Sequence, residues 1–199
     1  MKGFLTETLE TVLMALVIFL LLQASVQNFR VEGASMRHTL KEGEYLLVNK
    51  ITYLKFPLGG ATRVIKGLPV DPDLVVYPFH EPERGTIVIF RFPGDPRRFF
   101  VKRIIAVPGD LVEIRNGKVY INSKIRDEPY LDRSDRSDMD PVTVPQDSYF
   151  VLGDNRRHSN DSRDWSFTFV PRTHLIGQAW FTYGPFPRLD RLYPSRGVS

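Results

Sequence analysis

A run of sixteen residues near the start of the chain, residues 11–26, contains no charged side chain, and Gln23 is its only strongly polar member. A helix of that length covers roughly 24 Å at about 1.5 Å per residue, whereas a helix that crosses a bilayer needs about 20 residues. Gln27, Asn28 and Phe29 at the membrane interface would make up the difference. The run therefore predicts a single N-terminal membrane anchor, so the rest of the chain must fold beside a bilayer.

Three other interpretations of this run remain open: a cleaved signal peptide, a buried core helix and a helix that lies in the membrane surface. A signal peptide fits the short apolar run, but its basic start is weak because Glu7 and Glu10 follow Lys2. A core helix would normally carry a polar face, and this run shows almost none. We therefore favour an uncleaved anchor.

The side of the membrane on which the following domain lies is not decided by charge. Lys2 alone precedes the run, while Arg30, Arg37 and Lys41 follow it closely, and this count favours a cytoplasmic domain. Long domains cross membranes regardless of such counts, so the side stays open.

Beyond the anchor, the chain is patterned as short strands. Residues 45–50, 86–92 and 99–105 are rich in branched and aromatic side chains, and turn formers separate the last two segments. Asn-Gly at positions 116 and 117 suits a type I′ turn, and its flanks alternate, which predicts a hairpin over residues 112–121. We expect no further helix, and we expect surface loops at residues 59–82 and 127–140. The fold class is therefore mainly β, a folded antiparallel sheet or a partial barrel.

Composition narrows the chemistry. The chain has no cysteine, which excludes disulfides, a thiol nucleophile and cysteine-bound metal. Its net charge of +4 is mild and accompanies no recognition motif, so we expect no nucleic-acid partner. We also expect no metal and no cofactor.

Lys102 lies within the apolar strand of residues 99–105, where alternation sends Arg103 to the opposite face. An exposed lysine has a pKa of about 10.4 and is neutral in only about one molecule in 2,500 at pH 7. Burial lowers such a pKa by up to ~3–5 units, which would make Lys102 a usable general base. A partly buried lysine that pairs with a carboxylate explains the strand equally well.

Ser35 is preceded by Gly33, which lets a substrate approach the backbone closely. A loop serine or a helix cap explains the same residues. Residues 153–163 are dense in turn formers and charges, which suits either a solvated loop or a network that braces a site. Because a serine hydroxyl needs a base to attack, the three segments together indicate a hydrolase in which a lysine activates a serine.

These segments resemble the motifs of bacterial type I signal peptidases. The matching segments are residues 31–40 for the serine motif, 43–50 for the second motif, 101–110 for the lysine motif, 153–163 for the last motif, and 175–179 and 187–189 for the tail. They occur in the family's order and run from the anchor nearly to the end of the chain.

The resemblance implies an anchor at residues 1–28, a β catalytic core at residues 29–110 and 144–199, and a small β lobe inserted at residues 111–143. It also implies an activity, the removal of signal peptides from exported preproteins by a serine endopeptidase. Such an enzyme would be a single-pass protein of the cell membrane with its catalytic domain on the extracytoplasmic side. Its partners would be signal peptides and the lipid bilayer.

The resemblance further assigns roles to single residues. Ser35 matches the nucleophile, its backbone N–H matches an oxyanion donor, and Lys102 matches the general base. Ser159 matches the serine that orients the lysine amine. The charged residues that brace the site would be Asp154, Asp161 and Arg163, and the residues that bind small P1 and P3 side chains would be Phe29, Val31, Gly33, Met36, Leu40, Phe100 and Val101.

Two positions depart from the family pattern. Many members carry proline at position 38, where this chain has histidine, so the rigidity of the serine loop is in question. Some members carry serine at position 33, whose hydroxyl adds an oxyanion donor. With Gly33 that donor is missing or comes from elsewhere.

Two other functions stay in view. A Ser-His-Asp hydrolase would use one of the four histidines, His38, His80, His158 or His174. Nothing resembles a nucleophile elbow, however, and Lys102 would then have no role. An anchored β domain that only binds exported chains would need neither Ser35 nor Lys102.

Overall fold

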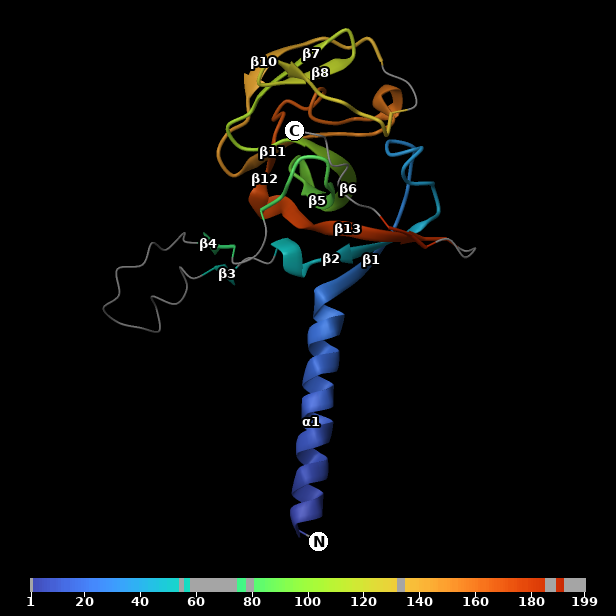
Figure 1. Ribbon diagram of the computed structural model, residues 1–199, viewed down its shortest axis with the longest axis vertical. Coiled ribbons are helices and arrows are strands. Elements are labelled where there is room, and N and C mark those ends of the chain that lie inside the picture. Colours follow the sequence, from blue (N-terminus) through green and yellow to red (C-terminus); the bar gives the residue numbers. More distant parts are fainter. Residues whose placement is uncertain are drawn as a thin grey trace, which may run out of the picture.

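The computed structural model describes residues 2–53, 56–57, 75–77, 81–131, 135–184 and 189–191. One long helix, α1 (Lys2–Ser25), stands as a stalk beneath a body built from strands (Figure 1). Within the described residues, Glu7–Ser25 is the one helical segment long and apolar enough to cross a membrane. Its large apolar side chains are exposed on every side: Leu9, Val12, Leu13, Met14, Leu16, Val17, Ile18, Phe19, Leu20, Leu21 and Leu22. A helix that is apolar all round and packs against nothing suits a lipid environment.

The helix passes into the sheet without a connecting loop. Strand β1 (Val26–Arg30) begins at the residue after α1, and its first residue pairs with Asn49. The backbone N–H of Lys50 also donates to the carbonyl of Ser25 at 2.9 Å. The helix therefore gains the length needed to cross a bilayer from residues before the apolar run, not from residues after it. The expectation that Gln27, Asn28 and Phe29 extend the helix was wrong, because they belong to β1.

The main sheet is antiparallel throughout, with the order β1-β2-β13-β5-β6-β11-β12 and β14 paired to β13. Its other strands are β2 (Tyr45–Asn49), β5 (Ile87–Phe92), β6 (Asp95–Ala106), β11 (Ser148–Leu152), β12 (Val170–Pro171), β13 (Leu175–Tyr183) and β14 (Leu189–Arg191). Strands far apart in sequence thus become neighbours, and β6 lies near the centre.

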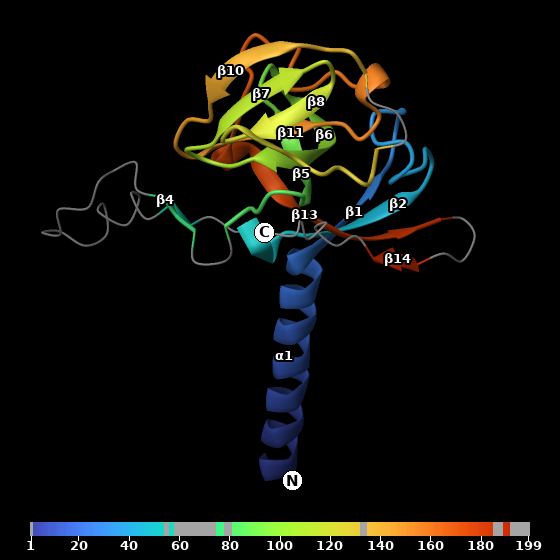
Figure 2. The ribbon, with the colours of Figure 1, turned by 45° about the horizontal axis from the view of Figure 1, so that its top comes forward.

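A second sheet has the order β10-β7-β8-β9 and lies at the end of the body opposite α1 (Figure 2). It comprises β7 (Leu111–Arg115), β8 (Lys118–Ile121), β9 (Lys124–Ile125) and β10 (Met139–Thr143). Its apolar face packs on β6 and β11 of the main sheet through a shared buried cluster. Short strands β3 (Phe56–Pro57) and β4 (Val75–Val76) form a separate pair.

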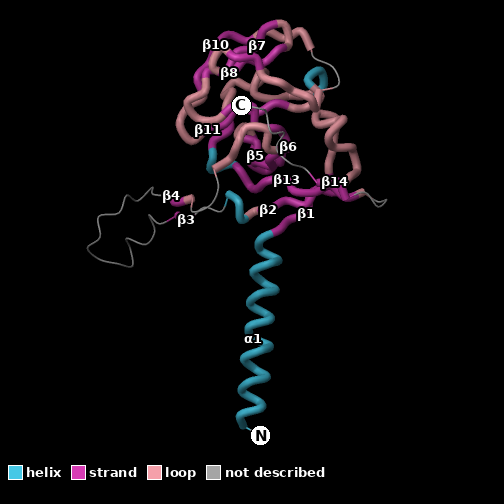
Figure 3. Tube along the Cα trace, viewed as in Figure 1, coloured by secondary structure: helices cyan, strands magenta, loops and turns pink. Residues whose placement is uncertain are grey.

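The predicted fold class is confirmed, since strands make up nearly all of the regular secondary structure described outside α1 (Figure 3). The predicted hairpin is β7–β8, and Asn116 and Gly117 have φ values of 49° and 74°, as a type I′ turn requires. Described residues beyond α1 include three short 3-10 helices, η1 (Ile51–Tyr53), η3 (Arg156–His158) and η4 (Arg172–His174).

The two predicted loops have different outcomes. Residues 59–82 lie mostly outside the described residues. The described residues of the other loop, 127–131 and 135–140, are only partly exposed, because Glu128, Tyr130 and Asp135 turn inward toward the main sheet. The expectation of an exposed loop was wrong for these three side chains. The division into anchor, core and inserted lobe stays a prediction.

Candidate active site

Ser35 lies in the loop between β1 and β2, and hydrogen bonds close this loop at its base. The N–H of Val31 donates to the carbonyl of Glu44 at 2.8 Å, and the N–H of Gly43 donates to the carbonyl of Val31 at 2.9 Å. Met36 and Leu40 are fully buried in the apolar cluster beneath the loop. The loop is therefore fixed on both sides of Ser35.

Lys102 reaches this loop from the centre of β6, where it pairs with Val88 of β5. Its side chain is buried, with 4% of the residue exposed. The Nζ atom donates to the Oγ of Ser35 at 2.7 Å and lies 5.4 Å from the centre of the Phe100 ring. The lysine is thus enclosed by apolar surface on one side and bonded to the hydroxyl on the other.

Burial lowers the pKa of Lys102 from its ordinary value to about 8. The carboxylates of Asp161 and Asp154 oppose this change, because a nearby negative charge favours the ammonium form. Desolvation is the larger effect. With this pKa, about one molecule in ten carries a neutral amine at pH 7.

The Ser35–Lys102 pair opens into a cleft of about 640 Å³. Its walls come from β1, the serine loop, β2, β5, β6 and the 153–163 segment: Phe29, Arg30, Val31, Glu32, Gly33, Ala34, Ser35, Leu46, Ile89, Arg98, Phe99, Phe100, Val101, Lys102, His158 and Asn160. The hydroxyl and the amine therefore meet at a surface that an extended peptide can reach.

Asn155 attaches the 153–163 segment to the serine loop. Its backbone N–H donates to the carbonyl of Ser35 at 2.9 Å, and its Nδ2 donates to the carbonyl of Ala34 at 2.9 Å. Sequence reasoning gave this residue no role, since a turn-rich segment does not indicate which of its side chains will bond to a distant loop.

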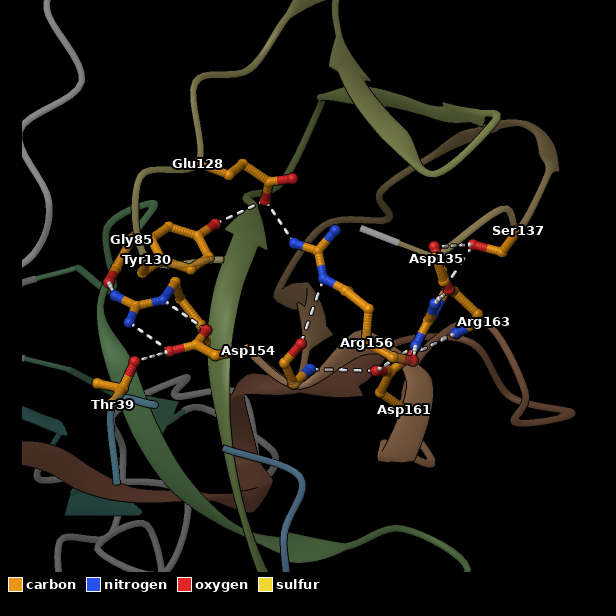
Figure 4. A network of polar contacts seen from close by, with 12 residues as sticks. Thr39, Gly85, Glu128, Tyr130, Asp135, Ser137, Asp154, Arg156, Asp161 and Arg163 are labelled. Carbon is orange, nitrogen blue, oxygen red and sulfur yellow. Dashed lines mark hydrogen bonds and ion pairs between the residues drawn. The ribbon is translucent and has the colours of Figure 1, made fainter. Parts of the chain in front are cut away.

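An ion pair lies on the face of β6 opposite to Lys102. Arg103 donates from Nε and NH2 to the two carboxylate oxygens of Asp154, at 2.9 and 2.6 Å, and from NH1 to the carbonyl of Gly85 at 2.8 Å (Figure 4). The Oγ1 of Thr39 also donates to Asp154, and the backbone N–H of Asp154 contacts the Sδ of Met36 at 3.5 Å. Asp154 therefore joins the serine loop to β6.

A second ion pair braces the same segment. Arg163 donates to both carboxylate oxygens of Asp161, at 2.9 and 3.1 Å, and Asp161 accepts the backbone N–H of Gly153 at 3.0 Å. Among the described residues, no group of three or more His, Cys, Asp or Glu side chains is placed to hold a metal ion.

Comparison with known proteins places this geometry in a family. Residues 5–184 match the model of the family described as signal peptidase, peptidase S26. The chain belongs to that family. A probable signal peptidase I-2 from Synechocystis is 34% identical over 92% of this chain and 75% of its own length. A signal peptidase I from Bacillus licheniformis is 33% identical over 96% and 94%.

A crystal structure of a signal peptidase I from Enterococcus faecalis V583 is 33% identical, covers 50% of this chain and 97% of its own chain, and has a TM-score of 0.44. The family match and the two curated relatives show that the present chain is a serine protease of the signal peptidase I type, and its N-terminal helix fits a membrane anchor.

Most residues that the sequence assigned to the site lie together in this signal peptidase. Phe29, Val31, Gly33, Phe100 and Val101 line the cleft. Met36 and Leu40 lie behind the serine loop and are not among the lining residues. Their part in substrate binding stays a prediction.

The buried Oγ of Ser159 has no hydrogen-bond partner in the part of the chain that the structure describes, so its lysine-orienting role stays a prediction. His158 lines the cleft, and its Nδ1 lies 3.2 Å from the Oδ1 of Asn155. His80 lies outside the described residues. The hydrogen bond to the Ser35 hydroxyl comes from the Nζ of Lys102.

The backbone at position 38 has a conformation that proline cannot adopt. His38 has a φ of 88°, whereas the proline ring fixes φ near −65°. The serine loop of this signal peptidase thus takes a course that proline could not follow.

Proposed function

We propose that this protein is a membrane-anchored endopeptidase that removes signal peptides from exported preproteins, with Ser35 as nucleophile and neutral Lys102 as general base. The observation that carries the proposal is the 2.7 Å contact between a buried lysine amine and a serine hydroxyl at an open cleft. Membership of the signal peptidase family supports the same substrate class.

The geometry suggests the following steps. As the Oγ of Ser35 attacks the scissile carbonyl carbon, the neutral Nζ of Lys102 takes the hydroxyl proton. The resulting ammonium returns this proton to the leaving amine nitrogen when the peptide bond breaks, which leaves an ester on Ser35. Water then attacks the ester while the amine again takes a proton, and the serine is regenerated. The backbone N–H of Ser35 would stabilise the oxyanion.

Small side chains at P1 and P3 are expected from the cleft walls. Phe29, Val31 and Val101 present apolar surface close to Ser35, and Leu46 and Ile89 line the cleft as well. Small apolar side chains would fit such a wall, and larger ones would have to displace packed residues. We propose Gly33, Met36, Leu40 and Phe100 as further contributors to these subsites.

Ser159, Asp154, Asp161 and Arg163 are proposed to orient or brace the pair. The catalytic domain is proposed to face the extracytoplasmic side, where translocated preproteins emerge, with α1 in the bilayer.

A fluorescent peptide whose cleavage site ends in Ala-x-Ala tests the proposal. The parent should cut this peptide after the second alanine, while Ser35→Ala and Lys102→Ala should abolish cleavage and remain folded. The double variant should be little worse than either single one, because the two residues act as one unit. Near-parent turnover by either single variant would exclude the Ser-Lys mechanism, and an intact parent that binds but never cuts would favour a binding domain.

A further inference from the structure

Gly153 occupies the space between the two serines of the site. A Cβ atom added to Gly153 would lie 2.2 Å from the Oγ of Ser159 and 2.5 Å from the carbonyl oxygen of Ser35. Distances this short leave no room for a side chain at position 153, because interiors are packed like crystals. A displacement of Gly153 toward either serine would therefore move Ser159 or the backbone of Ser35.

Both polar groups of Gly153 are held by charged side chains. Its N–H donates to the Oδ2 of Asp161 at 3.0 Å, and its carbonyl accepts from the Nε of Arg156 at 3.2 Å. Arg163 fixes Asp161 through two hydrogen bonds and also donates to the carbonyl of Arg156 at 2.7 Å. The position of Gly153 thus depends on two arginines that are linked to each other.

Each arginine ends on a carboxylate of the second sheet's long connection, between β9 and β10. The NH2 of Arg156 donates to Glu128, and the NH1 of Arg163 donates to Asp135 (Figure 4). The side chains are withdrawn from water: Arg156 is 1% exposed, Glu128 6% and Asp135 15%. The charges of these pairs are therefore weakly screened by solvent.

Glu128 reaches the site by another route as well. It accepts a hydrogen bond from the hydroxyl of Tyr130 at 2.6 Å, and the Tyr130 ring lies 3.9 Å from the guanidinium carbon of Arg103. Arg103 holds Asp154, the residue next to Gly153. Both routes from Glu128 end at adjacent residues of the catalytic segment.

We propose that Glu128 and Asp135 are positioning residues for the proposed peptidase reaction: through Arg156 and Arg163 they hold Gly153, and with it Ser159 and Ser35, in the reactive arrangement. Without Glu128, buried Arg156 loses the carboxylate that it pairs with, so its guanidinium must turn toward another acceptor and its hydrogen bond to Gly153 is lost. Without Asp135, Arg163 keeps Asp161 as a partner but loses the second ion pair that fixes its position, so its hydrogen bonds to Asp161 and Arg156 shift. The second sheet is in this view a part of the catalytic apparatus.

Neutral isosteres test the proposal, which rests on the proposed function. Glu128→Gln and Asp135→Asn remove the charge at nearly constant volume. Glu113→Gln is the matched control, because Glu113 lies in the same sheet and pairs with Arg115, whose side chain is 61% exposed. The readouts are kcat and KM on the Ala-x-Ala peptide and near-ultraviolet circular dichroism at the assay temperature.

A positioning role predicts that kcat falls while KM stays unchanged. We expect kcat of Glu128→Gln and Asp135→Asn to fall about 10- to 100-fold, as small displacements of reacting groups do. KM should stay near the parent value, because the cleft walls are untouched, and Glu113→Gln should match the parent in both. Combining Glu128→Gln with Arg156→Gln should cost little more than Arg156→Gln alone, since both act on one contact.

Folded variants whose kcat stays within about twofold of the parent would overturn the proposal, because an ion pair that only stabilises leaves catalysis intact. If Glu128→Gln does not fold, Glu128→Asp serves instead: it keeps the charge but withdraws it from Arg156, and an unchanged kcat would again overturn the idea. The parent and Lys102→Ala are assayed beside these variants. If the parent does not cleave the peptide, the proposed function is contradicted. If the parent cleaves it and the Glu128 and Asp135 variants are equally active, only this inference is contradicted.

Discussion

The amine of Lys102 lies 2.7 Å from the hydroxyl of Ser35, although the two residues are 67 positions apart in the chain. One stands at the centre of the main sheet on β6, and the other lies in a loop pinned by buried Met36 and Leu40. Neither side chain has to move far for the proton transfer proposed here.

The first prediction concerns pH. Burial places the pKa of Lys102 at about 8, and only the neutral amine can accept the serine proton. The value of kcat/KM should therefore rise tenfold per pH unit below about pH 8 and level off above it. Initial rates on the Ala-x-Ala peptide between pH 6 and 10 measure this. A rate that does not change over that range, with chemistry limiting, would contradict a titrating lysine.

The second prediction is that Lys102 lowers the free energy of unfolding. Below pH 8 its amine is charged in both the folded and the unfolded protein. Burying this charge costs about 3 kcal/mol, because the pKa is lowered by roughly 2.5 units. Between pH 8 and about 10.4 the unfolded chain binds more protons than the folded one, so parent stability rises with pH in that window.

Lys102→Met removes this cost and should be inactive but more stable than the parent at pH 7. The difference should shrink toward pH 10. Chemical unfolding in detergent, followed by tryptophan fluorescence at both pH values, measures the difference between the two proteins. Equal stability of parent and variant at pH 7 would contradict the burial argument.

A third prediction concerns Gly153. Gly153→Ala places a methyl group against the backbone of Ser35, so the nucleophile must shift, and activity should fall at least about 100-fold. Gly94→Ala is the control, because the three atoms nearest to its Cβ all belong to the side chain of Phe92 and none to the backbone of Ser35. Activity of Gly153→Ala near the level of Gly94→Ala would show that the contact is not tight.

A fourth prediction uses the backbone of the serine loop. His38 has a φ of 88°, a conformation that costs a side chain about 1–2 kcal/mol and costs glycine little. His38→Gly should therefore raise the free energy of unfolding slightly and retain activity, while His38→Pro should lower both. Arg37→Gly, at an exposed position with ordinary φ, should destabilise the protein. If His38→Gly folds but is inactive, a Ser-His-Asp mechanism that uses His38 would gain support.

The fifth prediction concerns the anchor. Deleting residues 2–23 leaves Ser25 and β1 in place, so cleavage of a soluble peptide should persist, whereas processing of membrane-inserted preproteins should slow. A deletion through Gln27 would also remove β1 residues that pair with β2, so it is a poorer test. In the full-length chain, replacing residues 11–22 with leucines keeps an apolar anchor and should leave processing at the parent rate. Equal processing rates for the parent and the deletion would show that membrane attachment does not matter.

Sequence patterns predicted the local elements well because their causes are local. Alternation and the Asn116-Gly117 turn determine the β7–β8 hairpin, and an uninterrupted apolar run determines α1. The pairing of β13 with both β2 and β5 had no such signal, since it joins segments more than 80 residues apart.

The candidate site shows the same limit. Resemblance to a family singled out Ser35 and Lys102, and burial then explains how the lysine loses its proton. Asn155, Glu128 and Asp135 were missed because their partners are chosen by tertiary packing. A segment rich in Asp, Arg and Ser looks solvated until the arginines that face it are known.

The direct passage of α1 into β1 has a mechanical meaning. The carbonyl of Ser25 is tied to Lys50, and only nine residues separate Ser25 from Ser35. With α1 in a bilayer, this short connection fixes the height of the cleft above the lipid surface. Tilting or rotating the stalk would turn the mouth of the cleft with it. The enzyme would then select a preprotein by the height of its scissile peptide bond above the membrane as well as by the side chains around that bond.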